Sequence, residues 1–236
     1  MSNESTNPAI KWILIAIIGV SFLVAVFFFL IATYPANEYS VARELKSRGF
    51  GIDYTARYNM VWQHPTSVWG HDQKITPDDF RLICQLPRLA GLDFLRCDAS
   101  GLNLDEIGNC KKLFSIQFSV TQFPTNEIPK LAACRVVNLA LKDIHFNDSD
   151  LDHLAGLTKL MFLDLQENPG ITDASFEYFE KIPYLKVLFL SKTSVTKEGG
   201  AEFRKKRPDV EVYFECPLTG VEMSICNRPL KTKPAP

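Results

Sequence analysis

Hydrophobic residues fall into two patterns along this chain, one long run and one repeat. The run, residues 12–33 (WILIAIIGVSFLVAVFFFLIAT), contains no charged residue and no proline. A helix rising about 1.5 Å per residue over this stretch crosses a hydrocarbon core of about 30 Å. Trp12 and Tyr34 stand at its ends, where interfacial aromatic residues are common. We therefore expect an uncleaved transmembrane helix at residues 12–33, after an N-terminal tail of residues 1–11.

The alternative for this run is a cleaved signal peptide. The run exceeds the roughly 7 to 15 residues of a signal-peptide core, and no A-x-A-like cleavage site follows it. Both observations favour the anchor. Orientation stays open, because Lys11 precedes the run whereas Arg43, Lys46 and Arg48 follow it. Counted alone, the excess of positive charge after the run places the larger part of the chain in the cytoplasm. Charges that flank a long domain determine orientation only weakly, however.

The second pattern recurs along most of the remaining chain. Its clearest unit is Leu160-x-x-Leu163-x-Leu165-x-x-Asn168, and the next unit begins 25 residues later at Leu185. Further units carry apolar residues at similar offsets: Leu89, Leu92 and Phe94; Leu113, Ile116 and Phe118; a shorter one with Cys134, Val137 and Leu139; and a terminal strand with Val210, Val212 and Phe214.

The two halves of each unit predict different elements. Alternation in the first half predicts a short strand whose fourth and sixth positions face inward. Apolar residues three apart in the second half predict a helix or 3₁₀ turn packed behind the strand. A single unit cannot bury its apolar face, so consecutive units must stack. The expected fold is an α/β solenoid.

These motifs resemble the leucine-rich-repeat family, in particular the bacterial variety whose units read L-x-x-L-x-L-x-x-T-x-[IV]-T-D. The resemblance covers roughly residues 75–214 and implies short parallel strands backed by helices or 3₁₀ turns. Residues 34–74 are expected to form a juxtamembrane helix, from Asn37 to Arg48, and an N-terminal cap. Residues 215–236 read as an irregular C-terminal tail.

One position departs from the family pattern. Cys97 and Lys142 occupy the place after the strand where Asn, Thr or Cys usually satisfies the turn backbone. A lysine fits poorly there. The third unit therefore either bulges or has a different register.

Composition and motifs narrow the possible functions. The chain is 46% hydrophobic and has 26 Lys and Arg against 27 Asp and Glu, so no global charge favours nucleic acid. The six cysteines form no C-x-x-C pair, and the four histidines lack ligand spacing, so we expect no metal site. P-loop, G-x-G-x-x-G and G-x-S-x-G motifs are absent. We expect no enzymatic activity, no cofactor and no small-molecule substrate.

The cysteines and two asparagines carry further expectations. Cys110 and Cys134 fall at aliphatic positions of the repeat and are expected to be buried thiols. Cys216 and Cys226 lie beyond the repeats and could close a loop in an oxidising compartment, which the sequence leaves open. Asn3 and Asn147 match the glycosylation pattern, but the repeats resemble bacterial ones, so we discount both.

In such a solenoid the variable strand positions project from a concave side. The expected partner-binding residues are Asp93, Arg96, Gln117, Asn138, Phe162, Asp164, Glu167, Phe189 and Lys192. This mixture of carboxylates, amides and phenylalanines suits a protein or peptide. Alternatively, Phe162 and Phe189 pack against each other across adjacent strands without any ligand.

Two functions of different classes remain. The first is a membrane-anchored repeat module that recognises a protein or peptide. The second is a structural scaffold that holds copies of itself at the membrane. In both cases we expect a single-pass protein of a bacterial inner membrane, with the side that holds the repeats unresolved.

Overall fold

The computed structural model describes residues 23, 37–56 and 63–215. Apart from Leu23, the apolar run at 12–33 lies outside the described residues, as do Asn3 and the pair Cys216 and Cys226. In the described ranges, no helix is both long and apolar enough to cross a membrane. The transmembrane anchor therefore stays a prediction.

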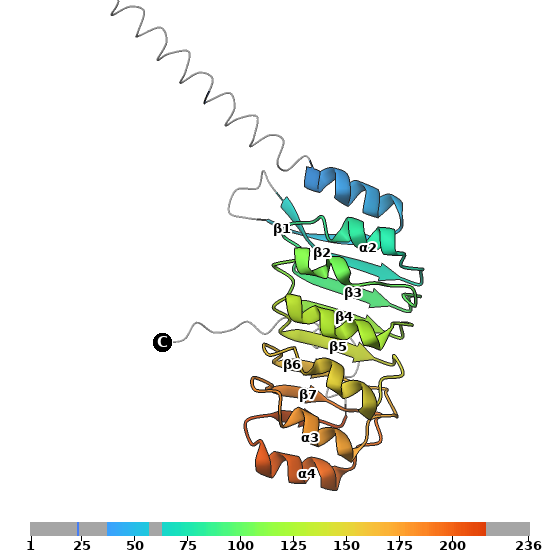
Figure 1. The fold of residues 1–236 in the computed structure, drawn as a ribbon. Coiled ribbons are helices and arrows are strands. Elements are labelled where there is room, and N and C mark those ends of the chain that lie inside the picture. Colours follow the sequence, from blue (N-terminus) through green and yellow to red (C-terminus); the bar gives the residue numbers. More distant parts are fainter. Residues whose placement is uncertain (1–22, 24–36, 57–62, 216–236) are drawn as a thin grey trace, which may run out of the picture.

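One sheet of eight strands, in sequence order, runs through the described chain. β1 (Gly51–Ala56) pairs antiparallel with β2 (Gln63–His71), and every later pair is parallel. The remaining strands are β3 (Gly91–Leu95), β4 (Ser115–Ser119), β5 (Asn138–Lys142), β6 (Phe162–Asp164), β7 (Val187–Phe189) and β8 (Glu211–Tyr213). Figure 1 shows them stacked like rungs along one axis.

Helices and 3₁₀ turns cover one side of this sheet. A helix over residues 37–47 comes first, followed by α2 (Pro77–Ile83), α3 (Phe176–Phe179) and α4 (Lys197–Lys206). The 3₁₀ turns are η1 (Asp105–Asn109), η2 (Thr125–Ala133), η3 (Asp148–Leu154) and η4 (Asp173–Ser175). Polar caps explain where several begin: Thr76 accepts a hydrogen bond from the Asp79 N–H, and the Asp79 carboxylate accepts one from the Thr76 N–H.

The core lies between the sheet and these helices and runs through every unit. Leu89, Leu113, Leu160 and Leu185, which open four units, are 0% exposed. Phenylalanine rings contact each other from unit to unit, with the Phe94 and Phe118 centroids 5.7 Å apart and the rings tilted. Burying one such side chain contributes roughly 1.5 to 3 kcal/mol. The chain therefore has the α/β fold of a leucine-rich-repeat solenoid, with strands at steps of 23 to 25 residues.

The third unit differs from its predicted register by two residues. Ile116 pairs with Leu139 and Phe118 with Leu141, so the leucine positions belong to Val136, Leu139 and Leu141 rather than to Cys134, Val137 and Leu139. A shift of two residues keeps every side chain on the same side of a strand. The alternation of apolar residues could not separate the two registers.

The corrected register also accounts for the lysine that fitted poorly. The turn position of this unit holds Ile144, which is 5% exposed, and Lys142 ends β5.

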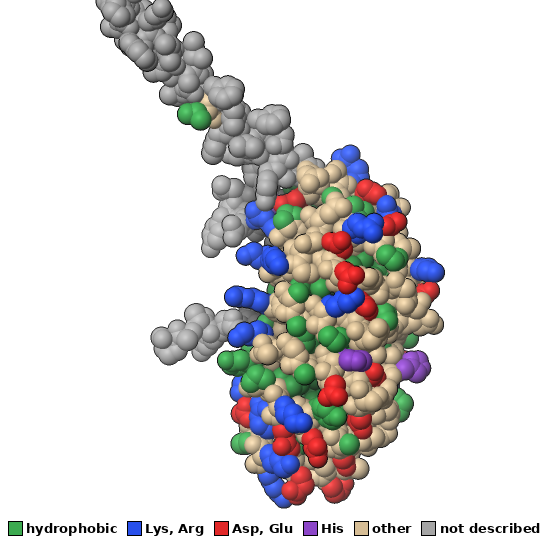
Figure 2. Space-filling model, in the orientation of Figure 1, with side chains coloured by type: hydrophobic (Ala, Val, Ile, Leu, Met, Phe, Trp, Pro, Cys, Tyr) green, Lys and Arg blue, Asp and Glu red, His purple; other side chains and the backbone are tan. Residues whose placement is uncertain are grey.

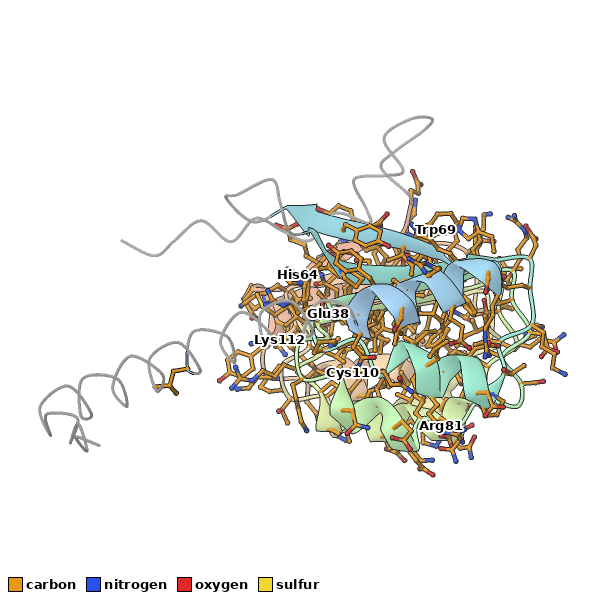
Figure 3. The ribbon with its side chains drawn as sticks, turned by 90° about the horizontal axis from the view of Figure 1, so that it is seen from above. Glu38, His64, Trp69, Arg81, Cys110 and Lys112 are labelled. Atoms are coloured by element: carbon orange, nitrogen blue, oxygen red, sulfur yellow. The ribbon has the colours of Figure 1, made fainter. Side chains whose placement is uncertain are left out.

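The N-terminal end of the sheet is closed by the helix at residues 37–47. Val41, Ala42 and Leu45 of this helix are buried. The Glu38 carboxylate, 4% exposed, lies 2.9 Å from Nδ1 of His64 in β2, and the two side chains meet in Figure 3. This helix therefore protects the apolar end of the first repeat.

Candidate functional site

The side of the sheet away from the helices corresponds to the predicted concave side. Trp69 and Arg81 of α2 lie on opposite sides of the sheet in Figure 3. We number each unit from its first leucine position and define the open face as the third and fifth positions of the units, which lie in strands β2 to β8. The third positions are Ser67, Gly91, Ser115, Asn138, Phe162, Val187 and Glu211, and the fifth are Trp69, Asp93, Gln117, Ala140, Asp164, Phe189 and Tyr213.

The open face has an unusual charge composition. Its fourteen positions include three carboxylates, Asp93, Asp164 and Glu211, but no lysine or arginine. The whole chain has 26 Lys and Arg. A surface used only for solvation is rich in long charged side chains. The open face lacks lysine and arginine and therefore differs in composition from such a surface.

Basic residues gather instead along the edge where the strands begin. Arg88, Lys112, Arg135 and Lys159 each directly precede the first leucine position of a unit. Figure 2 shows blue side chains along this edge, and Figure 3 labels Lys112 there. The near-neutral net charge of the chain therefore hides an uneven distribution between this edge and the open face.

The opposite edge, where the strands end, forms a rim that carries several ion pairs. The rim residues follow the strands in the left-handed conformation, with φ between 49° and 60°: Asp72, Arg96, Val120, Asp143, Glu167 and Lys192. Arg96 donates to both carboxylate oxygens of Asp72 at 2.6 and 2.7 Å, which lowers the pKa of Asp72. Glu167 lies 3.2 Å from Lys142 and 3.3 Å from Lys192.

The rim conformation has a structural purpose. The N–H of Arg96 donates to Ser119 O and that of Val120 to Lys142 O, and Asp72, Asp143 and Glu167 donate to the next unit in the same way. These five rim residues extend the hydrogen-bond ladder by one step while the chain turns. A β-branched residue such as Val120 adopts this conformation only at a cost.

The C-terminal half of the open face is filled by its own aromatic side chains. The ring centroids of Phe162 and Phe189 are 5.2 Å apart, and those of Phe189 and Tyr213 are 4.8 Å apart and stacked. Phe189 is only 6% exposed, whereas Phe162 is half-buried. Packing across strands thus accounts for Phe189, and Phe162 keeps the more accessible ring.

Asp164 lies beside this aromatic group. It is 9% exposed, and its Oδ1 accepts a hydrogen bond from the Gln166 N–H at 2.9 Å. Burial raises the pKa of Asp164 to about 6, against the smaller opposing effects of the Gln166 N–H and Lys142. At neutral pH a buried negative charge therefore sits in the middle of the open face.

The N-terminal half of the open face is hollow rather than filled. Small side chains at Ser67, Gly91 and Ser115 leave space between Trp69, Asp93 and Gln117. Trp69 is 37% exposed. The sequence did not reveal Trp69 as a candidate, because Gly70 stands where the other units have an apolar residue such as Phe94. The only signal for a repeat unit around β2 is the 24-residue step from Trp69 to Asp93.

The nine predicted partner-binding residues divide into two groups in the structure. Asp93, Gln117, Asp164 and Phe189 are fifth positions, and Asn138 and Phe162 are third positions of the open face. Asn138 was expected at a fifth position, which Ala140 occupies. Arg96, Glu167 and Lys192 belong to the rim. The fold gathers all nine on the open face or its rim.

From the sequence we expected no metal site and two buried thiols, Cys110 and Cys134. Within the described residues, no three His, Cys, Asp or Glu side chains are grouped to hold a metal ion. Cys110 is 1% exposed, as expected. The expectation was wrong for Cys134, which is half-buried because Val136 takes the first leucine position of that unit. Its Sγ lies 3.1 Å from Ile107 O.

Comparisons with known proteins add similarities of fold only. No protein-family model matches the sequence, and no curated protein does. Among solved structures, an internalin (inlF) of Listeria monocytogenes aligns with TM-score 0.45 and 18% identity over 64% of this chain and 41% of its own. Internalin C2 (inlC2) of the same species aligns with TM-score 0.45 and 16% identity over 62% of this chain and 69% of its own. A leucine-rich-repeat protein of Leptospira interrogans aligns with TM-score 0.41 and 21% identity over 57% of this chain and 33% of its own.

The chain thus spans less than half the length of two of these three structures. The leucine-rich-repeat fold rests on the repeat of this chain itself, whose strands stay in register over six consecutive parallel pairs.

Proposed function

We propose that this chain is a membrane-anchored leucine-rich-repeat module that binds a protein or peptide partner, without catalysis, through the open face and its rim. Residues 12–33 would be the anchor, in a bacterial inner membrane, and residues 75–214 the repeat domain. The binding residues would be the nine named from the sequence, with Trp69 added.

One observation supports this proposal most directly, namely the composition of the open face. Aromatic residues are enriched in protein interfaces, whereas lysine is depleted there. The open face carries Trp69, Phe162, Phe189 and Tyr213 and no lysine. Leucine-rich solenoids use such extended surfaces for binding.

A self-associating scaffold is the second candidate. The internal packing of Phe162, Phe189 and Tyr213 favours it, because this half of the face is protected without a foreign ligand. In that case the partner at the membrane is another copy of the chain.

Site-specific photocrosslinking in membranes tests the proposal. The photoreactive residue p-benzoylphenylalanine would replace Gln117 or Ala140 on the open face, with Glu177 and Lys197 on the helical side as matched controls; both controls are exposed. We expect one defined foreign adduct from positions 117 and 140 and none from 177 and 197. Adducts only from the helical side would refute binding through the open face, and adducts to the chain itself would favour the scaffold.

The anchor needs a separate measurement. The intact mass of the membrane-extracted protein should correspond to a chain that retains residues 12–33. A mature chain that starts near residue 35 would refute the anchor and leave a secreted repeat protein.

A further inference from the structure

The hollow in the N-terminal half of the open face has a defined floor and walls. Its volume is about 210 Å³. Ser67, Gly91 and Ser115 form the floor, because they are the third positions of three adjacent strands. A Cβ atom at Gly91 would approach Ser67 Oγ to 2.9 Å, so a side chain at this position would displace the Ser67 hydroxyl and fill part of the hollow.

Trp69 provides an aromatic wall that is held in place from below. Trp69 lies opposite Gly51 in the β1 and β2 pair, and a Cβ atom at Gly51 would fall 1.9 Å from the indole ring. The indole therefore occupies the volume that a side chain at position 51 would need. Trp69 remains 37% exposed although the His71 ring lies 5.0 Å from its ring, centroid to centroid, so part of the indole is available for contact.

Two carboxylates line the same hollow, Asp93 and Asp53. Oδ1 of Asp93 is buried and has no hydrogen-bond partner among the described residues. Burial and, to a smaller extent, Asp53 raise the pKa of Asp93, while His71 lowers it. Gln117 adds a polar side chain, hydrogen-bonded to Ser119 Oγ at 3.2 Å.

This set of groups discriminates between classes of ligand. An anion would face two carboxylates at close range, and an aliphatic side chain would leave the buried oxygen of Asp93 unsatisfied. A planar cation satisfies both features, since a guanidinium donates in pairs to a carboxylate and stacks on an indole.

We propose that this hollow is the specificity site for an arginine side chain of the partner, with Asp93 as the carboxylate that pairs with the guanidinium and Trp69 as the aromatic platform. This inference rests on the proposed function, because it treats the hollow as part of the partner-binding face. Asp53, which is exposed, reinforces the negative potential, and Gln117 borders the alkyl part of the side chain.

The experiment uses small probes in place of the unknown partner. N-acetyl-arginine methylamide is titrated into the full-length protein in detergent, with the uncharged citrulline analogue as matched probe. The readout is ¹⁹F NMR of protein labelled with 5-fluorotryptophan. The chain contains three tryptophans, at positions 12, 62 and 69, and the Trp69 signal is assigned by its loss in Trp69→Phe.

We expect the arginine probe to shift the Trp69 signal saturably and the citrulline probe to bind at least about tenfold more weakly, as for loss of a charge-assisted hydrogen bond. Asp93→Asn should weaken the arginine probe by a similar factor. Asp78→Asn, which removes an exposed carboxylate on α2 behind the sheet, should leave it unchanged. The unfolding midpoint of Asp93→Asn should be at or above that of wild type, because position 93 no longer carries a partly buried charge.

Three results would overturn the arginine site: equal shifts from both probes, full affinity in Asp93→Asn, or no Trp69 shift up to the solubility limit of the arginine probe. The probe comparison in wild-type protein needs no variant, so a folding defect cannot obscure it. Crosslinks from positions 117 and 140 without probe binding would remove only this inference. Probe binding without open-face crosslinks would instead remove the proposed protein partner and keep the cation site.

Discussion

At the scale of single residues, buried polar groups determine how this solenoid responds to its environment. Asp164 is the clearest case, because burial raises the pKa of its carboxyl from 3.8 to about 6. Between about pH 4 and pH 6 the Asp164 carboxyl is therefore protonated in a larger fraction of folded molecules than of unfolded ones. By linkage, the contribution of Asp164 to the unfolding free energy falls as pH rises through this window.

Asp164→Asn should remove that fall and raise the unfolding free energy at pH 7 by roughly 1 to 3 kcal/mol. Chemical denaturation at pH 4.5 and pH 7 measures both effects. Asp209→Asn is the control of opposite sign, because Arg207 and Lys186 hold the pKa of this exposed carboxyl below its usual range. Its stabilisation is present at neutral pH and is lost only in acid. A less stable Asp164→Asn at pH 7 would contradict the burial argument.

Asn168 illustrates how one side chain serves two units. It is 0% exposed, and its Oδ1 accepts from the N–H groups of Ile144 and Phe146 while its Nδ2 lies 2.7 Å from Leu141 O. Ile144 holds the equivalent turn position in the preceding unit and offers no polar atom there, so Asn168 satisfies that backbone as well as its own.

Asn168→Ala should lower the unfolding free energy by roughly 3 kcal/mol, because several buried backbone groups lose their partner. Thr193→Val is the comparison in the next unit, where the hydroxyl donates only within its own unit, to Leu190 O, and about 1 kcal/mol is expected. Urea denaturation of both variants measures the two losses of unfolding free energy. Similar losses would mean that bonds between units contribute little.

At the scale of elements, the register of β5 is the decisive feature of the third unit. Leu141 pairs with Phe118 and is 0% exposed, whereas the register expected from sequence ends the apolar positions of this strand at Leu139. The two-residue shift moves Asn138 from the fifth to the third position of the open face.

Leu141→Ala should therefore cost about 2 to 5 kcal/mol, as for other buried leucines. Leu163→Ala is the matched control, since both registers place that residue in the core and it is 0% exposed. Thermal and chemical unfolding of the two variants should give comparable losses. A Leu141→Ala loss below about 1 kcal/mol would restore the register expected from sequence.

At the scale of the whole molecule, the solenoid is a row of units that contact only their neighbours, so damage should stay local. The helix at residues 37–47 covers one end with Leu45, which is 0% exposed. At the other end, Phe203 of α4 stacks on Phe176 with centroids 4.9 Å apart.

Leu45→Ala should accelerate amide hydrogen exchange in the helix at 37–47, β1, β2 and α2 while β6 to β8 keep their protection. Phe203→Ala should produce the mirror pattern, with losses confined to α4, β7 and β8. Hydrogen exchange read by mass spectrometry resolves these segments. Uniform loss along the whole chain in either variant would show a single cooperative unit instead.

The sequence by itself determined the repeat and most of its core. Leu160, Leu163 and Leu185 could be assigned because each unit carries the same local alternation, and strand and helix periodicities are properties of neighbouring residues. The candidate surface followed from the same offsets, since positions between core residues must face outward. Asp93, Gln117 and Phe162 were found in this way.

The tertiary structure decided what depends on contacts between units. Pairing with β4 selected the register of β5, stacking on neighbouring rings buried Phe189, and desolvation by surrounding units raised the pKa of Asp164. Trp69 became part of the open face only because the antiparallel pair of β1 and β2 continues the sheet, with Gly51 beneath the indole. Local periodicity states which side of a strand a residue faces, whereas its burial and its partners depend on the adjacent strand.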